Sequence, residues 1–148
     1  MEDEQIIEKV QIAIYDAVAS DLGLLRAGSV EDTFAATLRD RLLPFFQTDR
    51  ITVDVNYNKH GLTTKTLSGK RIELDIAIHQ RHNDECNIVA IELETNNYPK
   101  RDDVWKLVDL TGGIDGYSYR LGLFFVVGVK SRAGEIIDMT WYKSGREL

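Results

Sequence analysis

Two neighbouring segments decide the fold: Arg71-Ile-Glu-Leu-Asp-Ile-Ala-Ile-His-Gln80 and, after a short polar stretch, Asn87-Ile-Val-Ala-Ile-Glu-Leu-Glu-Thr95. Apolar side chains recur at every second position in the first segment and in most of the second, which is the period of a β-strand. Asn83 and Asp84 lie between the segments and suit a turn. The pattern predicts an antiparallel hairpin.

A turn centred between Asn83 and Asp84 fixes which residues of the hairpin face each other. The opposed pairs are then Asp75 and Glu92, Glu73 and Glu94, Ala77 and Ala90, and His79 and Ile88. Directly opposed residues share a face of a sheet, so four carboxylates gather on one side. The other side is expected to be core and holds Ile72, Leu74, Ile76, Ile78, Val89, Ile91 and Leu93.

The gathered acids need compensation, because each like-charged pair across two strands costs about 0.2–1 kcal/mol. Lys, Arg or a metal ion would supply it. Glu92 and Glu94 have Cα atoms about 6.6 Å apart on one face, and with Asp75 they can surround one hard divalent ion. An all-oxygen site favours magnesium, manganese or calcium over zinc. The competing interpretation is an acidic face that is simply solvated, as in many antiparallel sheets.

These residues resemble the motif of the PD-(D/E)xK nuclease superfamily. In that motif an Asp on one strand precedes an apolar strand ending in Glu-x-Lys, and a helix and a further buried strand follow. The resemblance covers roughly residues 29–129 and implies a restriction-endonuclease-like fold. It also implies that Asp75 and Glu92 bind Mg²⁺ or Mn²⁺, helped by the carbonyl of Leu93, with Glu31 as an extra acid near the metal. A favourable interaction with the helix dipole also explains Glu31.

The chain departs from the family pattern at two positions. Leu74 stands where the family often has Pro, and Glu94 stands where it has its catalytic Lys. Some restriction endonucleases of the superfamily use Glu-x-Glu and are active, with Glu94 then part of the catalytic set. In others the Lys has moved to the next helix, which points to Lys106 here and, less strongly, to Lys100. The alternative is an inactive site.

The rest of the chain predicts an α/β fold, a mixed sheet flanked by helices in the order ααβββαββ, with residues 1–148 as a single domain. One helix is expected from residue 6 until Gly23, and a second from its cap Ser29, with Asp32 as a weak capping-box partner, until Pro44 stops it. Further strands are expected at 51–57, 121–129 and 136–142, and a helix at 104–110, capped by Asp102 or Asp103 and ended by Gly112.

Composition excludes several classes of protein. Of the 148 residues, 43% are hydrophobic and 28% charged, which argues against disorder. The longest apolar run, at 123–127, is too short to span a bilayer, and the acidic residues after Met1 are unlike a signal peptide. A single cysteine, Cys86, allows neither an internal disulfide nor a zinc knuckle. The cytoplasm is the expected location, with no membrane partner.

The charge is unevenly distributed. The net charge of −6 speaks against a nucleic-acid-binding surface over the whole protein. The segment from Arg50 to Arg71, however, contains five basic residues and only one acidic residue. This segment is expected to contain a mobile polar loop at 63–69, and it is interpreted either as a phosphate-binding edge or as a solvated hairpin. The candidate contacts are Lys59, Lys65, Lys70 and Arg71, and the three lysines are expected to be exposed.

A metal-dependent, endonuclease-like phosphodiesterase acting on DNA is the function these observations favour. One alternative is an inactive nuclease-fold module for nucleic-acid binding or assembly, and another is an acidic protein-interaction domain. Because the chain is short, a homodimer or a partner protein would supply further recognition surface. Tyr98, Trp105, Tyr117 and Tyr119 could stack on bases, although core or rim packing is the more common role of aromatic residues.

Overall fold

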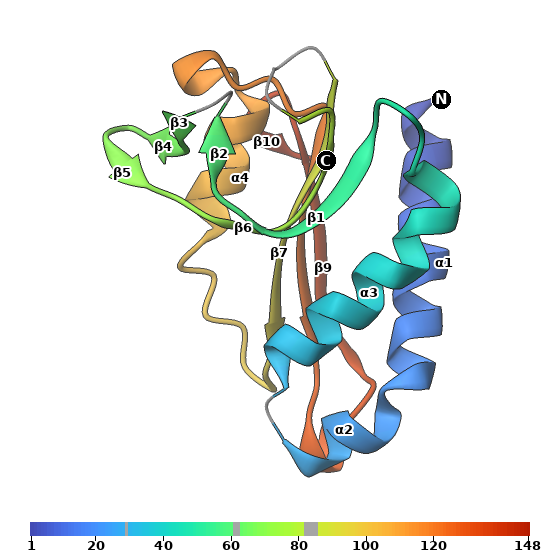
Figure 1. Cartoon of the computed structure of the whole chain (residues 1–148). Helices are drawn as coiled ribbons and strands as arrows, with labels where there is room; N and C mark the ends of the chain where they lie inside the picture. Colours follow the sequence, from blue (N-terminus) through green and yellow to red (C-terminus); the bar gives the residue numbers. More distant parts are fainter. Residues whose placement is uncertain (29, 61–62, 82–85) are drawn as a thin grey trace.

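A six-stranded mixed sheet with the order β1-β6-β7-β8-β9-β10 lies at the centre of the computed structural model (Figure 1). The structure describes residues 1–28, 30–60, 63–81 and 86–148. The strands are β1 (Thr52–Tyr57), β6 (Leu74–His79), β7 (Asn87–Thr95), β8 (Leu121–Val127), β9 (Ile136–Lys143) and β10 (Arg146–Glu147). β7 and β8 run parallel, and the other neighbouring pairs are antiparallel.

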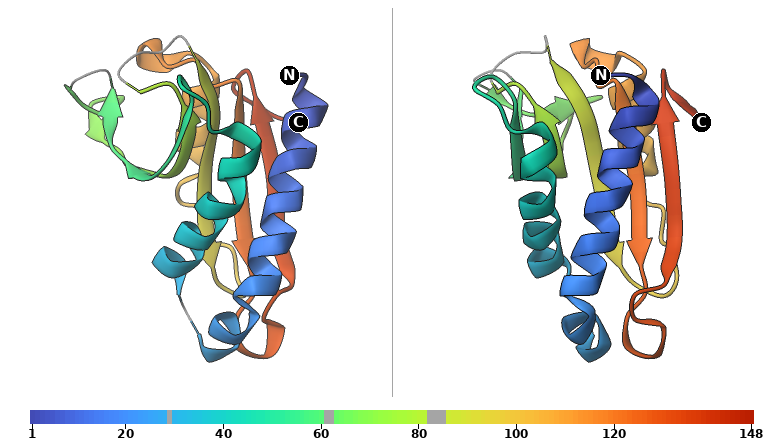
Figure 2. Two further views of the ribbon diagram at one scale, coloured as in Figure 1. Left: turned by 45° about the vertical axis from the view of Figure 1, so that its right-hand side comes forward. Right: turned by 90° about the vertical axis from the view of Figure 1, so that its right-hand side faces the viewer.

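Helices cover both faces of this sheet (Figure 2). On one face lie α1 (Asp3–Ser20), α2 (Leu22–Ala27) and α3 (Glu31–Phe46), and on the other lies α4 (Val104–Thr111), which connects β7 to β8. Two short 3₁₀ helices follow, η1 (Ile114–Gly116) and η2 (Lys130–Arg132). Every residue of β8 is buried, because this strand is covered on both faces, as its continuous apolar sequence predicts. The expected α/β class with a mixed sheet is confirmed.

The helix ends differ from the expectations at two points. The first helix ends at Ser20, and Gly23 lies inside the separate helix α2. Pro44 does not stop α3, which continues to Phe46. Pro44 stands in the last turn, where it removes its own N–H bond, while Phe46 packs into the core and the N–H of Gln47 still bonds to Leu43 at 2.9 Å. The expected cap Ser29 lies outside the described residues.

The predicted register of the central hairpin is confirmed over three pairs: Ile76 with Ile91, Ala77 with Ala90, and Ile78 with Val89. A β-bulge then shifts the pairing, so that His79 lies opposite Asn87 and not opposite Ile88 as expected. The expected turn residues, 83 and 84, lie outside the described residues.

One part of the predicted core face is wrong. Ile72 and Leu74 pack on the α4 side of the sheet, whereas Ile76 packs on the α1–α3 side. The paired strand β1 changes face at the same place, with Val55 on the α1–α3 side and Tyr57 on the α4 side. Asn56 between them has a φ of 50°, in the left-handed region that Asn tolerates better than most residues.

The segment 58–71, called the arm below, includes the stretch 63–69 that was expected to be a loop, but described residues of this stretch form strands. Its described residues form two short antiparallel pairs, β2 (Lys59–His60) with β3 (Thr63–Thr64), and β4 (Thr66–Leu67) with β5 (Lys70–Arg71). Leu67 is fully buried. The hydroxyl of Tyr117 donates to the carbonyl of Thr66 at 2.9 Å, and the N–H of Ser68 donates to Asp115 at 2.7 Å. These contacts fasten the arm over α4 and η1.

In the described part of the chain, no helix has the length and apolar character needed to cross a bilayer.

Candidate functional site

An acidic cleft of about 390 Å³ lies where β7 ends, beside the start of β6 and the N-terminus of α3. Its lining residues are Glu31, Asp75, Leu93, Glu94, Thr95, Asn96, Lys100 and Asp103. Asp75 comes from β6, Glu94 from β7 and Glu31 from the first turn of α3. The structure therefore brings three of the predicted site acids together from three separate elements.

Glu92 lies beside Asp75 and is only 3% exposed. The carboxylate of Asp75 is fixed against β7, because its Oδ2 accepts the N–H of Leu93 at 2.8 Å. Burial, the charge of Asp75 and a hydrogen bond with Asp75 together raise the pKa of Glu92 well above its ordinary value. The folded chain thus resists a second negative charge at this position.

Glu31 and Glu94 complete the cluster at the rim of the cleft. Burial and then the charges of Asp75 and Glu94 raise the pKa of Glu31, although a hydrogen bond from the backbone of Thr95 partly opposes the shift. Glu94 is half-buried, and both of its carboxylate oxygens accept the N–H of Lys100, at 3.1 and 3.2 Å. Glu73 does not belong to the cluster: it precedes β6 and is exposed.

Lys106 projects from the first turn of α4 toward the buried acid. Its Nζ lies 3.5 Å from Glu92 Oε1 and 3.3 Å from Asp103 Oδ1. Burial alone would lower the pKa of Lys106, but the charges of Glu92 and Asp103 raise it. Asp103 thus gives the Lys106 ammonium a second acidic partner besides Glu92. Lys100, the less favoured candidate, lines the cleft itself.

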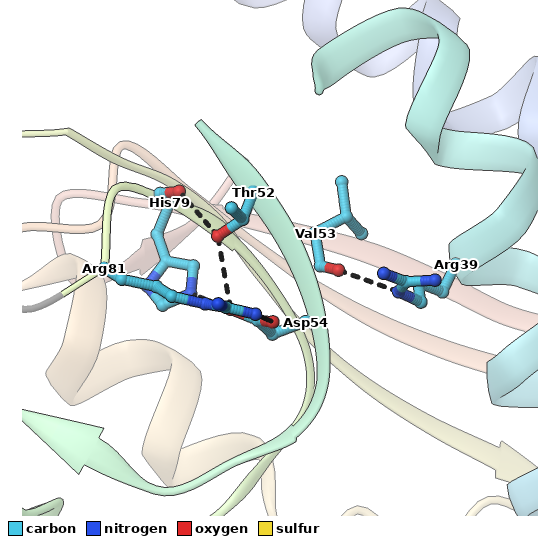
Figure 3. A network of polar contacts seen from close by, with 6 residues as sticks. All are labelled: Arg39, Thr52, Val53, Asp54, His79 and Arg81. Atoms are coloured by element: carbon cyan, nitrogen blue, oxygen red, sulfur yellow. Dashed lines mark hydrogen bonds and ion pairs between the residues drawn. The ribbon is translucent and has the colours of Figure 1, made fainter. Parts of the chain in front are cut away.

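Asp54 of β1, which pairs with the second half of β6, is an acid whose charge is compensated by neighbouring side chains. Asp54 accepts hydrogen bonds from His79 at 2.8 Å and from Arg81 Nε at 3.0 Å, and its second oxygen pairs with Arg81 Nη2 (Figure 3). Burial alone would raise the pKa of Asp54, but the bonds from Arg81 and His79 hold it well below its ordinary value. Asp54 is thus paired with a guanidinium and an imidazole, whereas Glu92 lies beside a second carboxylate, Asp75.

The predicted nucleic-acid contacts separate into different environments. Lys70 and Arg71 are exposed on β5, and the ammonium of Lys70 lies 5.5 Å from the ring centroid of half-buried Trp105. Lys65 was expected to be exposed, and this is wrong: it is 2% exposed. Its Nζ lies over three tyrosine rings, at 4.5 Å from Tyr117, 5.3 Å from Tyr57 and 5.7 Å from Tyr119. The side chain of Lys59 lies outside the described residues.

Sequence reasoning missed Asn96 and Asp103 as cleft residues. Both belong to the polar connection between β7 and α4, where turn residues are common and carry little information by themselves. The available signal was their position, because the carboxyl end of a parallel strand is where α/β proteins most often place a site.

The donors at the cleft suit a hard divalent cation in their chemistry. Asp75, Glu92 and Glu94 offer oxygen atoms, and a cation would relieve the repulsion that raises the pKa of Glu92. In the residues that the structure describes, no three His, Cys, Asp or Glu side chains already converge as closely as metal coordination requires. A metal ion would therefore have to draw these side chains together.

Comparisons with known proteins do not assign the chain to a family. No model of a protein family matches it, and no curated protein matches it significantly.

Proposed function

We propose that the protein is a metal-dependent phosphodiesterase of the endonuclease type that acts on DNA. The observation that carries the proposal is the placement of Asp75 beside buried Glu92 at the end of β7, with the Lys106 ammonium 3.5 Å from Glu92. Strong perturbation of titratable groups in a cleft is typical of functional sites. The compensated Asp54 shows that the fold does not leave every acid in that state.

The order of elements supports the same proposal. A helix, α3, precedes three antiparallel strands, β1, β6 and β7, and α4 then leads to β8, which is parallel to β7. This is the order implied by the resemblance to PD-(D/E)xK nucleases, with a restriction-endonuclease-like fold as the finer assignment.

Each residue has a defined part in the proposed reaction. Asp75 and Glu92, with Glu94 and Glu31 nearby, would hold Mg²⁺ or Mn²⁺, which supplies Lewis-acid activation of a phosphate and a more acidic water when bound. Lys106 would stabilise charge that develops on the phosphate, in place of the motif Lys.

Lys70 and Arg71 on β5 and Lys100 at the cleft would hold the DNA phosphates on its two sides. Such contacts position a strand without reading its sequence.

Cleavage of a supercoiled plasmid in Mg²⁺ or Mn²⁺ tests the proposal. We expect Asp75→Asn and Lys106→Ala each to reduce cleavage by about 100-fold or more, and Asp49→Asn, an exposed acid in the bend before β1, to be as active as the wild type. DNA binding without cleavage in either metal would favour the inactive nuclease-fold module. If the wild type neither binds nor cleaves DNA, the proposal is refuted.

A further inference from the structure

The aromatic residue next to the acidic cleft is far more exposed than the other candidate stacking residues. Tyr98 is 78% exposed, whereas Tyr117 and Tyr119 are buried at 0% and 2%. Tyr98 lies between Asn96 and Lys100, which both line the cleft. Its exposed ring is therefore attached to the segment that forms the cleft rim.

This segment is held in place on both sides of Tyr98. The N–H of Tyr98 bonds to Asn96 Oδ1 at 3.2 Å, and the N–H of Lys100 bonds to Glu94. Asn97 accepts the N–H of Val129 through its Oδ1 at 2.8 Å.

At the far end of the segment, Arg101 pairs with Asp138 at 2.5 Å and donates to the hydroxyl of Tyr142 at 3.0 Å. An aromatic ring presented on a fastened backbone loses little conformational entropy when a ligand covers it.

Burying an apolar ring is favourable, so a partner with a flat apolar face would gain free energy by covering Tyr98. The neighbouring groups restrict that partner's chemistry. Lys100 offers an ammonium at the cleft, and Lys70 offers another beside Trp105, which lies in the first turn of α4. Flat rings joined by phosphates satisfy both the aromatic and the cationic groups, and unpaired nucleotides present them together.

We propose that Tyr98 is a stacking platform for an unpaired base, so that the strand held at the cleft is single-stranded or frayed there. This inference rests on the proposed function and defines its substrate class. In a continuous duplex the base faces are covered by their neighbours, and Tyr98 would have no face to contact. Tyr98 thus confers a preference for strands with unpaired bases, and Lys100 and Lys70 contact phosphates irrespective of pairing.

Fluorescence anisotropy with the full chain tests the inference, with Ca²⁺ present and two DNA probes. One is a labelled single strand on the order of 15 nucleotides, and the other is its blunt duplex. We expect Tyr98→Ala to weaken single-strand binding about 5- to 150-fold and to change duplex binding little. Tyr98→Phe keeps the ring and should bind like the wild type. Tyr15→Ala is the matched control, because Tyr15 lies on α1 and is 58% exposed.

A 2-aminopurine base in the single strand gives an independent readout. Wild-type protein should change its fluorescence through stacking, and Tyr98→Ala should not. If the wild type binds the strand but Tyr98→Ala binds equally well, the stacking inference is overturned and the proposed function stands. If the wild type binds neither probe, both the proposed function and the stacking inference are refuted.

Discussion

Lys65 offers a sharp test of what the arm does, because it is a basic residue that is buried within a ring of tyrosines. It is 2% exposed, with its ammonium 4.5 Å from the Tyr117 centroid. Lys65→Ala removes three buried methylene groups, worth about 2.4 kcal/mol at about 0.8 kcal/mol each. Loss of the cation–π contacts adds about 1–2 kcal/mol for a desolvated ammonium. We expect the free energy of unfolding to fall by about 3.4–4.4 kcal/mol.

Urea denaturation and thermal melting measure this loss. For a chain of 148 residues, the loss corresponds to a decrease in Tm of roughly 7–18 °C. Lys65→Met keeps most of the stem and should lose about 1–2 kcal/mol. Lys70→Ala is the matched control, since Lys70 is an exposed lysine of the same arm that also lies over an aromatic ring, and it should cost about 0.5 kcal/mol.

A Lys65→Met variant as stable as the wild type would refute the cation–π reasoning. An effect of this variant on the salt dependence of DNA binding would contradict the burial of Lys65, because a buried ammonium cannot displace counterions from DNA.

Three further outcomes follow from the cleft and the arm. Mg²⁺, Mn²⁺ or Ca²⁺ should stabilise the wild type by about 2.7 kcal/mol at a hundredfold excess over Kd, and thermal melting of Asp75→Ala should show no such shift. Burial and the charge of Asp75 raise the folded-state pKa of Glu92. The contribution of Glu92 to stability is therefore complete below about pH 4, where the carboxyl is protonated in the folded and the unfolded chain, and it is lost as pH rises through the raised pKa. Glu92→Gln should therefore gain stability relative to the wild type between pH 4 and pH 8 in urea titrations without metal, and a pH-independent difference would contradict this. Lys70→Glu combined with Arg71→Glu should reduce the slope of log K against log salt for DNA binding by about 2, and an unchanged slope would exclude the arm as a docking edge.

The central hairpin could be predicted because its information is local. The pairing of Ile76 with Ile91 follows from the strand period and the position of the turn. The same local pattern placed Asp75 and Glu92 on neighbouring strands, and the N–H of Leu93 indeed bonds to Asp75. Short-range periodicity therefore specified both the sheet and the acids beside the cleft.

The fate of the arm could not be predicted in that way. Lys65 stands in the sequence Thr63-Thr-Lys-Thr-Leu-Ser-Gly69, which is polar and typical of an exposed turn. Its burial depends on Tyr117 and Tyr119, more than fifty positions later in the chain. The residues next to Lys65 in the sequence do not indicate that contact. Asp103 was similarly expected only as a helix cap and turned out to line the cleft.

The charge balance of the cleft explains why a cation is central to the proposed chemistry. Asp75, Glu92 and the other acids, Glu31, Glu94 and Asp103, outnumber the two lysines, Lys100 and Lys106, by five to two. A phosphate diester that approaches such a cluster is repelled, and Lys106 is already paired with Glu92 and Asp103. Any phosphate at this cleft therefore requires added positive charge. A divalent ion and a basic peptide would both supply it, but only the ion leaves a coordination position for the phosphate. DNA binding at the cleft should thus disappear in EDTA, whereas binding of a basic peptide should strengthen as the metal is removed.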